Sequence, residues 1–173
     1  HARKAIEKGA TGLIAVAAGA GGHAGNLSPF ALVAELRQWF DGPLLLSGAI
    51  STGGAVLAAQ AMGADLAYIG SAFIATEEAR ASDAYKQAIV EGTSDDIVYS
   101  SLFTGVHGNY LKASVRNAGL DPDHLPESDP TKMNFGGGAA KAWKDIWGCG
   151  QGIGAVKAVV PVAEMQGKLR AAL

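Results

Sequence analysis

A histidine among glycines is the residue of this sequence best suited to chemistry. His23 follows Gly21 and Gly22 within residues 17–26, AAGAGGHAGN. An imidazole titrates near neutral pH and can act as a general base, and glycine lets a ligand approach the main chain closely. The segment therefore predicts a ligand site with a basic side chain. The alternative is a turn whose histidine faces water, since glycine pairs are common in loops.

Two later segments combine bare backbone with small hydroxyl groups. Residues 47–54 read SGAISTGG, and residues 69–73 read IGSAF. Main-chain N–H groups and hydroxyls suit the oxygens of a phosphate, above all where a helix begins. Either segment alone could be a tight turn between a strand and a helix, but the two together favour a phosphate site. Its predicted contacts are Ser47, Gly48, Ala49, Gly70 and Ser71.

Buried strands and helices are predicted to alternate through residues 1–76. The predicted strands cover residues 11–18, 43–50 and 65–73. The predicted helices cover residues 1–8, 28–40 and 52–64, with Gly9 as a C-cap and Ser28 before Pro29 as an N-cap. Continuous apolar strands indicate a parallel α/β sheet covered on both faces. Active sites of parallel barrels lie at the carboxyl ends of the strands, where the three segments above fall.

Residues 77–173 follow a different pattern. The predicted elements are a helix over 76–93 with Glu77 and Glu78 in its first turn, a strand over 96–103, a helix from about Gly108, an irregular loop over 121–141 and a terminal helix over 155–173. His124 belongs to the irregular loop and is predicted to face solvent. His107 has two interpretations that stay open, as a residue beside the site or as a structural residue.

The glycine-rich residues 148–154, GCGQGIG, do not predict a dinucleotide site. A Rossmann fingerprint follows a strand, whereas the segment before this one looks helical, with Trp143 and Trp147 spaced to pack on one helix face. Only its residue type would support Cys149 as a nucleophile, so no such role is predicted.

Composition excludes several classes of protein. With 49% hydrophobic and 17% charged residues, the 173-residue chain is expected to fold around a core. A net charge of -2 without a basic cluster argues against nucleic-acid binding. A single cysteine and the lack of Cys/His metal spacing predict no disulfide, no metal and a reducing compartment. No apolar run is long enough for a membrane span and no signal peptide is evident, so a soluble cytoplasmic protein is expected.

Four segments together resemble the nitronate monooxygenases, also called 2-nitropropane dioxygenases. They are residues 9–25, 44–76, 103–111 and 143–156. The resemblance implies an FMN-dependent (β/α)8 TIM barrel that oxidatively denitrifies alkyl nitronates or nitroalkanes with O2. It implies that residues 1–76 are the last three barrel strands with the FMN-phosphate loops. Residues 77–173 would be a mainly helical substrate-side region with the irregular loop and the terminal helix.

The resemblance also assigns roles to residues. His23 matches the proposed base that takes the α-proton of the substrate, and His107 falls beside the substrate cavity. Gly48, Gly70 and Ser71 match the loops that hold the flavin phosphate. The remaining expected flavin contacts are Gly21, Gly22, Ser47, Ala49 and Gln151.

The sequence departs from the family pattern at several positions. Ala49 stands where a second glycine is usual, Ser71 replaces a usual threonine, and Val16 and Ala17 are apolar where a glutamine often touches the flavin. A complete barrel needs about 250 residues, so this chain is expected to require a missing N-terminal half or self-association.

Two other classes of function remain open on the sequence. One is an NAD(P)H:quinone reductase or an enoyl reductase on the same flavin scaffold, since a fold and a flavin site do not fix the substrate. The other is a non-catalytic half-barrel that binds phosphate or a partner protein.

Overall fold

A parallel sheet and its helices form the first part of the chain. The computed structural model describes residues 1–128 and 145–171. Strands β1 (Leu13–Val16), β3 (Leu44–Ser47) and β4 (Leu66–Ala67) form a parallel sheet in the order β1-β3-β4. Helices α2 (Pro29–Arg37) and α3 (Gly53–Ala61) connect them, and α1 (Ala2–Glu7) precedes them. The predicted alternation of parallel strands and helices is confirmed, with β4 much shorter than expected.

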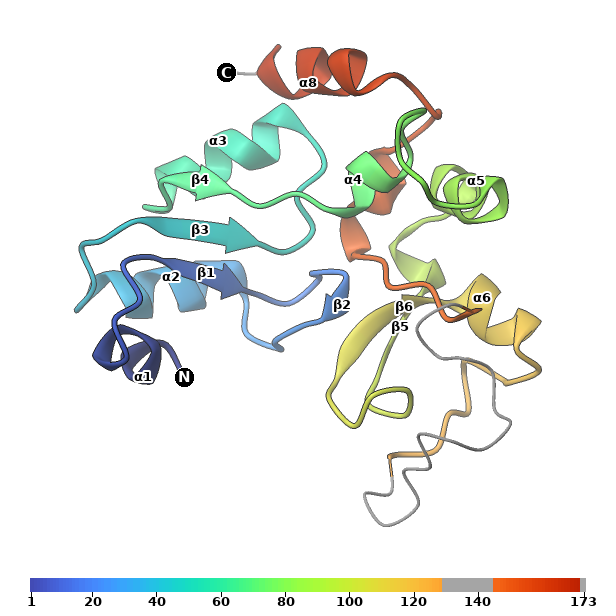
Figure 1. Cartoon of the computed structure of the whole chain (residues 1–173), viewed down its shortest axis with the longest axis horizontal. Helices are drawn as coiled ribbons and strands as arrows, with labels where there is room; N and C mark the ends of the chain where they lie inside the picture. The colour runs from blue at the N-terminus through green and yellow to red at the C-terminus, as the bar shows by residue number, and fades with distance from the viewer. Residues whose placement is uncertain (129–144, 172–173) are drawn as a thin grey trace.

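A second, antiparallel sheet joins the loop after β1 to the later part of the chain. Its order is β2-β6-β5, with β2 at Gly22–His23, β5 at Ile97–Ser100 and β6 at Gly108–Leu111. Gly22 pairs with Asn109, and His23 pairs with Gly108. Figure 1 shows β2 reaching from the parallel sheet toward β5 and β6. His23 therefore lies on a short strand, and its side chain is exposed.

The remaining elements surround a second core. They are α4 (Ser71–Ile74), α5 (Asp83–Glu91), the 3₁₀ helices η1 (Ser94–Asp96) and η2 (Gln151–Ala155), α6 (Lys112–Asn117) and α8 (Val162–Arg170). Ala72 of α4 and Ala75, just after it, pack with Ile89 of α5 and Ile153 of η2. The second core thus ties the loop after β4 to the C-terminal part of the chain.

Three predicted helices have the wrong bounds. The helix expected over 76–93 begins only at Asp83, because the Ser82 hydroxyl accepts from Tyr85 N–H and starts it there. Glu77 and Glu78 precede it, and the Glu78 carboxylate accepts from Val162 N–H at the start of α8 instead.

The helix expected from Gly108 is a strand for its first four residues, since Gly108–Leu111 pairs with β5 and β2. The terminal helix expected over 155–173 begins at Val162. Proline at position 161 lacks the N–H that a helix interior requires, so the helix starts after it. Of the irregular loop, residues 129–141 lie outside the described residues.

Only one face of the parallel sheet is covered by the described residues. Leu13, Ala15, Leu44 and Leu46 are buried against α2 and α3. On the opposite face Ile14 is 50% exposed and Leu66 57% exposed, and the register aligns both with Leu45. The expectation of two covered faces is therefore wrong for this part of the chain, and β1 alternates between buried and exposed side chains. Among the described helices, none has the length and apolar character needed to cross a membrane.

Arg37 at the end of α2 is hydrogen-bonded to the segments that precede β3 and β4. Its guanidinium donates four hydrogen bonds of 2.7–3.0 Å. The acceptors are the carbonyl oxygens of Phe40, Gly42 and Gly63 and the carboxylate of Asp65. The same carboxylate accepts from Leu44 N–H at 2.8 Å. That backbone hydrogen bond, together with the bond from Arg37, lowers the pKa of Asp65 below its ordinary value.

Arg37→Lys is expected to lower the free energy of unfolding at pH 7 by about 1–3 kcal/mol, because one ammonium cannot serve four acceptors in a fixed fork. The Asp65 pKa is lowered in the folded state, so the stabilisation from this carboxylate is present above its unfolded pKa. It is lost as pH falls through the lowered value. The difference between the variant and the parent should therefore shrink in acid. Urea unfolding from pH 7 to pH 2 measures it, and a difference independent of pH would contradict the role of Asp65.

Candidate functional site

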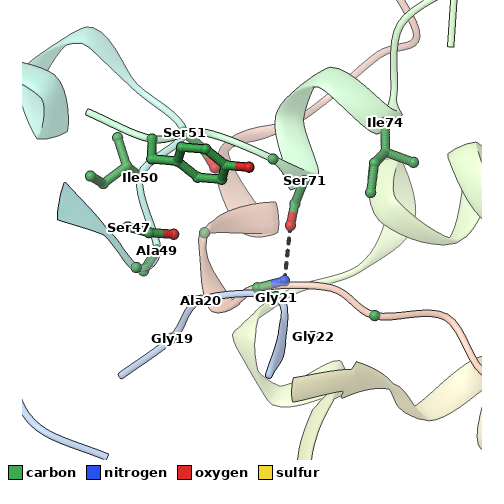
Figure 2. A pocket seen from close by; sticks show the side chains of 16 residues that line it. Gly19, Ala20, Gly21, Gly22, Ser47, Ala49, Ile50, Ser51, Ser71 and Ile74 are labelled. Carbon is green, nitrogen blue, oxygen red and sulfur yellow. Dashed lines mark hydrogen bonds between the residues drawn. The ribbon is translucent and has the colours of Figure 1, made fainter. Parts of the chain in front are cut away.

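A cavity of about 200 Å³ lies at the carboxyl ends of the parallel strands. We call it the glycine cavity, because its wall comes from the loops after β1, β3 and β4 and from the loop 148–152. Figure 2 shows these loops converging from different parts of the chain. Seven of the predicted flavin contacts line it. They are Gly21, Gly22, Ser47, Gly48, Ala49, Gly70 and Ser71.

Small hydroxyls face this cavity from three places. Ser47 ends β3, Ser51 precedes α3 and Ser71 begins α4. The Ser71 hydroxyl accepts a hydrogen bond of 2.9 Å from Gly150 N–H, drawn as the dashed line in Figure 2. This bond links the loop after β4 to the loop 148–152. The wall therefore offers both hydroxyl groups and main chain to a polar ligand.

Ala49 has a backbone conformation that favours glycine. Its φ is +54°, and the preceding Gly48 has φ +148°. The left-handed conformation costs an alanine roughly 1–2 kcal/mol, and such strain is concentrated at functional sites. A hydrogen bond of 3.2 Å from Ala49 N–H to the carbonyl of Gly19 helps to hold it. The departure from the usual glycine thus leaves the loop conformation in place.

The glycines of the cavity serve two different purposes. A Cβ atom on Gly21 would lie 2.8 Å from Gly150 N, and one on Gly150 would lie 2.6 Å from the Gly19 carbonyl oxygen. These two positions require glycine because two loops pack backbone on backbone. A Cβ on Gly70 would meet nothing within 4 Å, and the same holds for Gly22, whose φ is +68°. Gly22 and Gly70 therefore border open space.

A second cavity, of about 890 Å³, adjoins the first. We call it the histidine cavity because His23 lines it, and it shares Gly22 and Gly148 with the glycine cavity. The His23 Nε2 atom lies 2.9 Å from the hydroxyl of Thr104. Strand β2 thus lies where a cavity rich in glycine and serine meets a cavity that His23 lines.

Aromatic side chains form much of the second wall. Tyr85 and Trp147 stack with ring centroids 4.9 Å apart, and Phe103 meets Tyr110 edge to face at 5.0 Å. The Tyr85 hydroxyl donates to the Gly148 carbonyl, and burial raises its pKa. These rings form an aromatic wall in which burial keeps the Tyr85 phenol protonated. The predicted pairing of Trp147 with Trp143 involves a residue outside the described ranges.

Cys149 is fully buried. Burial raises the pKa of its thiol to about 11, against hydrogen bonds with Ser71 and Gly150 that lower it. A thiol with this pKa stays protonated at neutral pH, whereas a nucleophile must be a thiolate. The side chain packs with Ile153 and Leu111 as part of the second core.

Two expected site residues lie elsewhere. The ring of His107 packs 5.0 Å from that of Tyr99, and its carbonyl accepts from Ala24 N–H. Gln151 donates its N–H to the Gly19 carbonyl at 2.9 Å. Neither residue is part of the lining of the two cavities, so their expected ligand contacts stay predictions.

His124 pairs with Asp121 on an exposed turn, where the hydrogen bond between them raises the pKa of the imidazole. This agrees with its predicted position in solvent.

Asn109 was not singled out from the sequence, although its side chain is hydrogen-bonded to the segment that precedes His23. It is 2% exposed, and its side-chain N–H donates to the Ala20 carbonyl at 2.7 Å. Its backbone carbonyl accepts from Cys149 N–H at 3.1 Å. The side-chain oxygen has no hydrogen-bond partner within the described residues. A polar residue in the apolar strand 108–111 was the available signal, because a buried amide needs partners.

Gly150→Ala is expected to lower the free energy of unfolding by about 1–3 kcal/mol, because the added methyl group would overlap the Gly19 carbonyl and force the loops apart. Gly54→Ala is the matched control, since its Cβ would meet only the Thr52 hydroxyl oxygen at 4.0 Å. It should leave stability unchanged or slightly raised. Thermal unfolding of both variants provides the comparison, and equal midpoints would contradict the packing requirement at Gly150.

Comparisons with known proteins show which family the chain resembles. The model of the nitronate monooxygenase family matches residues 1–169. A protein of Mycobacterium tuberculosis with a provisional monooxygenase assignment is 34% identical over 135 residues, which is 77% of this chain and 35% of that protein. The nitronate monooxygenase of Paraburkholderia phytofirmans is 27% identical over 141 residues, which is 76% of this chain and 38% of that protein.

Solved structures with the same fold extend the comparison. A nitroalkane oxidase from Streptomyces ansochromogenes matches with a TM-score of 0.76 and 27% identity, over 99% of this chain and 54% of that one. FabK from Thermotoga maritima matches with a TM-score of 0.74 and 23% identity, over 99% of this chain and 57% of that one, which shows the fold alone. The chain thus spans about half or less of these proteins. Through the match over residues 1–169, the chain belongs to the nitronate monooxygenase family.

Proposed function

We propose that this chain is the flavin-binding part of an FMN-dependent oxidoreductase that oxidises nitroalkanes or their nitronates with O2. The observation that carries the proposal is the junction of the two cavities at Gly22 and Gly148. One cavity offers main chain and hydroxyls to a phosphate, and the other presents His23 to a substrate. The family match and the 27% identity to a nitroalkane oxidase support this choice of reaction.

The glycine cavity has the chemistry that a flavin phosphate needs. Ser47, Ser51 and Ser71 line it, and a Cβ on Gly70 would project into open space where phosphate oxygens could lie. Backbone concavities of this kind bind anions through N–H groups. FMN, when bound, supplies the redox chemistry of the reaction. The residues of the chain anchor the cofactor and orient the substrate.

His23 would act on the substrate as a general base. A neutral nitroalkane must lose its α-proton before oxidation: the C–H bond breaks, the proton goes to an imidazole nitrogen, and the electron pair spreads over the nitro group to give the nitronate. A substrate supplied as nitronate needs no such step. The strand pairing of His23 with Gly108 holds the imidazole at the wall of the histidine cavity.

Further chain would have to complete the sheet. Ile14, Leu45 and Leu66 form an apolar row on the face that the described helices leave uncovered. Large exposed apolar surfaces and open sheet edges indicate a missing contact. We infer that the remaining strands of a barrel, or a second copy of the chain, cover this row in the active protein.

Gly70→Val is expected to lower FMN occupancy, because its side chain would fill the space left for the phosphate. The fold should be retained, since no atom beyond the two chain neighbours lies within 4 Å of the Cβ position. The visible absorbance of the purified assembled protein measures bound flavin, and circular dichroism measures the fold. Full flavin content in a folded variant would remove the phosphate assignment. Rapid anaerobic bleaching of the parent protein by NADH would favour a reductase instead.

His23→Asn, in assembled protein that still binds FMN, is expected to reduce kcat/KM on nitroethane by about 100- to 10,000-fold, the usual contribution of a general base. Activity on ethylnitronate should fall far less, because the anion has already lost its proton. Steady-state oxygen consumption on both substrates tests this split. Equal losses would show that His23 binds the substrate and does not take its proton.

A further inference from the structure

Tyr110 carries a buried hydroxyl group that lines the histidine cavity. The residue is 6% exposed, and its side chain packs with Val115 and Ile146. In the part of the chain that the structure describes, no group forms a hydrogen bond with this hydroxyl. It is not sealed in the core either, because Asn109 Oδ1 is the only described side-chain atom that is both fully buried and without a partner. The Tyr110 hydroxyl therefore opens onto the cavity.

The position of this hydroxyl is close to the junction of the two cavities. Gly22 and Gly148 line both of them, and Tyr110 forms an antiparallel bridge with Gly148. A Cβ atom on Gly108 would lie 2.9 Å from Tyr110 Oη and 2.6 Å from the Gly22 carbonyl oxygen. Residues two apart in a strand share a face, so glycine at position 108 leaves the space in which the phenol oxygen lies beside Gly22.

Other polar side chains of the histidine cavity are exposed or already engaged. Arg80 and Asp145 have opposite charges, and both are exposed. The hydroxyls of Tyr85 and Thr104 each donate to a main-chain carbonyl. Among the described residues of this lining, Tyr110 is thus the buried hydroxyl whose proton is available to a ligand.

We propose that Tyr110 is a further catalytic residue, whose O–H donates to a nitro oxygen of the substrate and stabilises the negative charge that forms there. The inference rests on the proposed function, because it takes a nitroalkane or nitronate as the ligand of the histidine cavity. When the C–H bond breaks, the proton goes to the base and the electron pair spreads onto the nitro oxygens. Tyr110 keeps its own proton throughout, so its role does not depend on which atom takes the proton of the substrate.

A donor at this position acts mainly on the transition state. A hydrogen bond to a charged acceptor is about twice as strong as one to a neutral acceptor, so the bond from Tyr110 strengthens as the nitro group gains charge. Only interactions that strengthen on the way to the transition state accelerate the chemical step. A substrate supplied as nitronate carries the charge before it binds, and the same bond then contributes to binding.

Thermal unfolding of Tyr110→Phe separates this role from a structural one. The variant keeps the ring and removes only the oxygen. Because a buried hydroxyl without a partner costs free energy, the midpoint should stay the same or rise. Tyr99→Phe is the matched control, since the Tyr99 hydroxyl donates to the Ala24 carbonyl at 3.0 Å and the residue does not line the histidine cavity. A lower midpoint in Tyr110→Phe than in Tyr99→Phe would show a structural hydroxyl and overturn the proposal.

Kinetics of the assembled, FMN-loaded protein test the step itself. Tyr110→Phe is expected to lower kcat on nitroethane by about 100- to 1,000-fold, the usual cost of losing one donor to a developing oxyanion. On ethylnitronate it should raise KM and change kcat little, because the lost bond contributed equally to the bound substrate and the transition state. Tyr99→Phe should match the parent protein on both substrates. An unchanged kcat on nitroethane, or equal losses of kcat on both substrates, would contradict the role of Tyr110.

Propionate binding tests the same contact without turnover. Propionate has the heavy-atom skeleton of ethylnitronate, with a carboxylate in place of the nitronate group. Calorimetry on the assembled protein should give a Kd roughly tenfold or more higher in Tyr110→Phe than in the parent, as expected for a hydrogen bond to a charged group, and an unchanged Kd in Tyr99→Phe. Equal affinity in the parent and Tyr110→Phe, or no binding to the parent, would overturn the inference. Failure of the proposed function is a separate result, seen as a parent protein that binds no FMN or oxidises no nitroalkane.

Discussion

The carbonyl oxygen of Gly19 joins the loops on which both cavities depend. It accepts from Ala49 N–H at 3.2 Å and from Gln151 N–H at 2.9 Å, so the segment after β1 is tied to the loop after β3 and to the start of η2. Gly150 passes so close to this oxygen that a Cβ atom would lie 2.6 Å from it. A side chain at that position would separate the loops and open both cavities. Close packing of the loops therefore requires glycine at position 150.

Packing of this kind brings glycines of several loops into the wall of the glycine cavity, beside serines and the side chains of Ile50, Tyr68 and Ile74. Main-chain N–H groups and small hydroxyls are groups that suit an anion. The histidine cavity has a different wall of stacked and edge-on aromatic rings. Strand β2 lies at the boundary between the two cavities, and its residue Gly22 lines both of them. The proposed phosphate site and the proposed base thus come from adjoining residues.

Pairing of β2 with β6 positions His23, and buried hydrogen bonds hold β2 in place. Gly22 pairs with Asn109, whose amide holds the Ala20 carbonyl and whose carbonyl accepts from Cys149 N–H. Because a buried amide that loses its partner costs free energy, these bonds favour one conformation of the segment. The apolar row on the parallel sheet, in contrast, is left exposed by the described residues.

The sequence by itself determined the local elements and the candidate residues. Apolar runs and glycine boundaries predicted three parallel strands with their helices, and residue chemistry singled out His23 and the hydroxyl loops. These features depend on neighbouring residues only. The tertiary structure decided what depends on distant partners: β6 forms where a helix was expected because β2 and β5 pair with it. It also placed Thr104 against His23, since hydrogen bonds over 81 residues leave no local pattern.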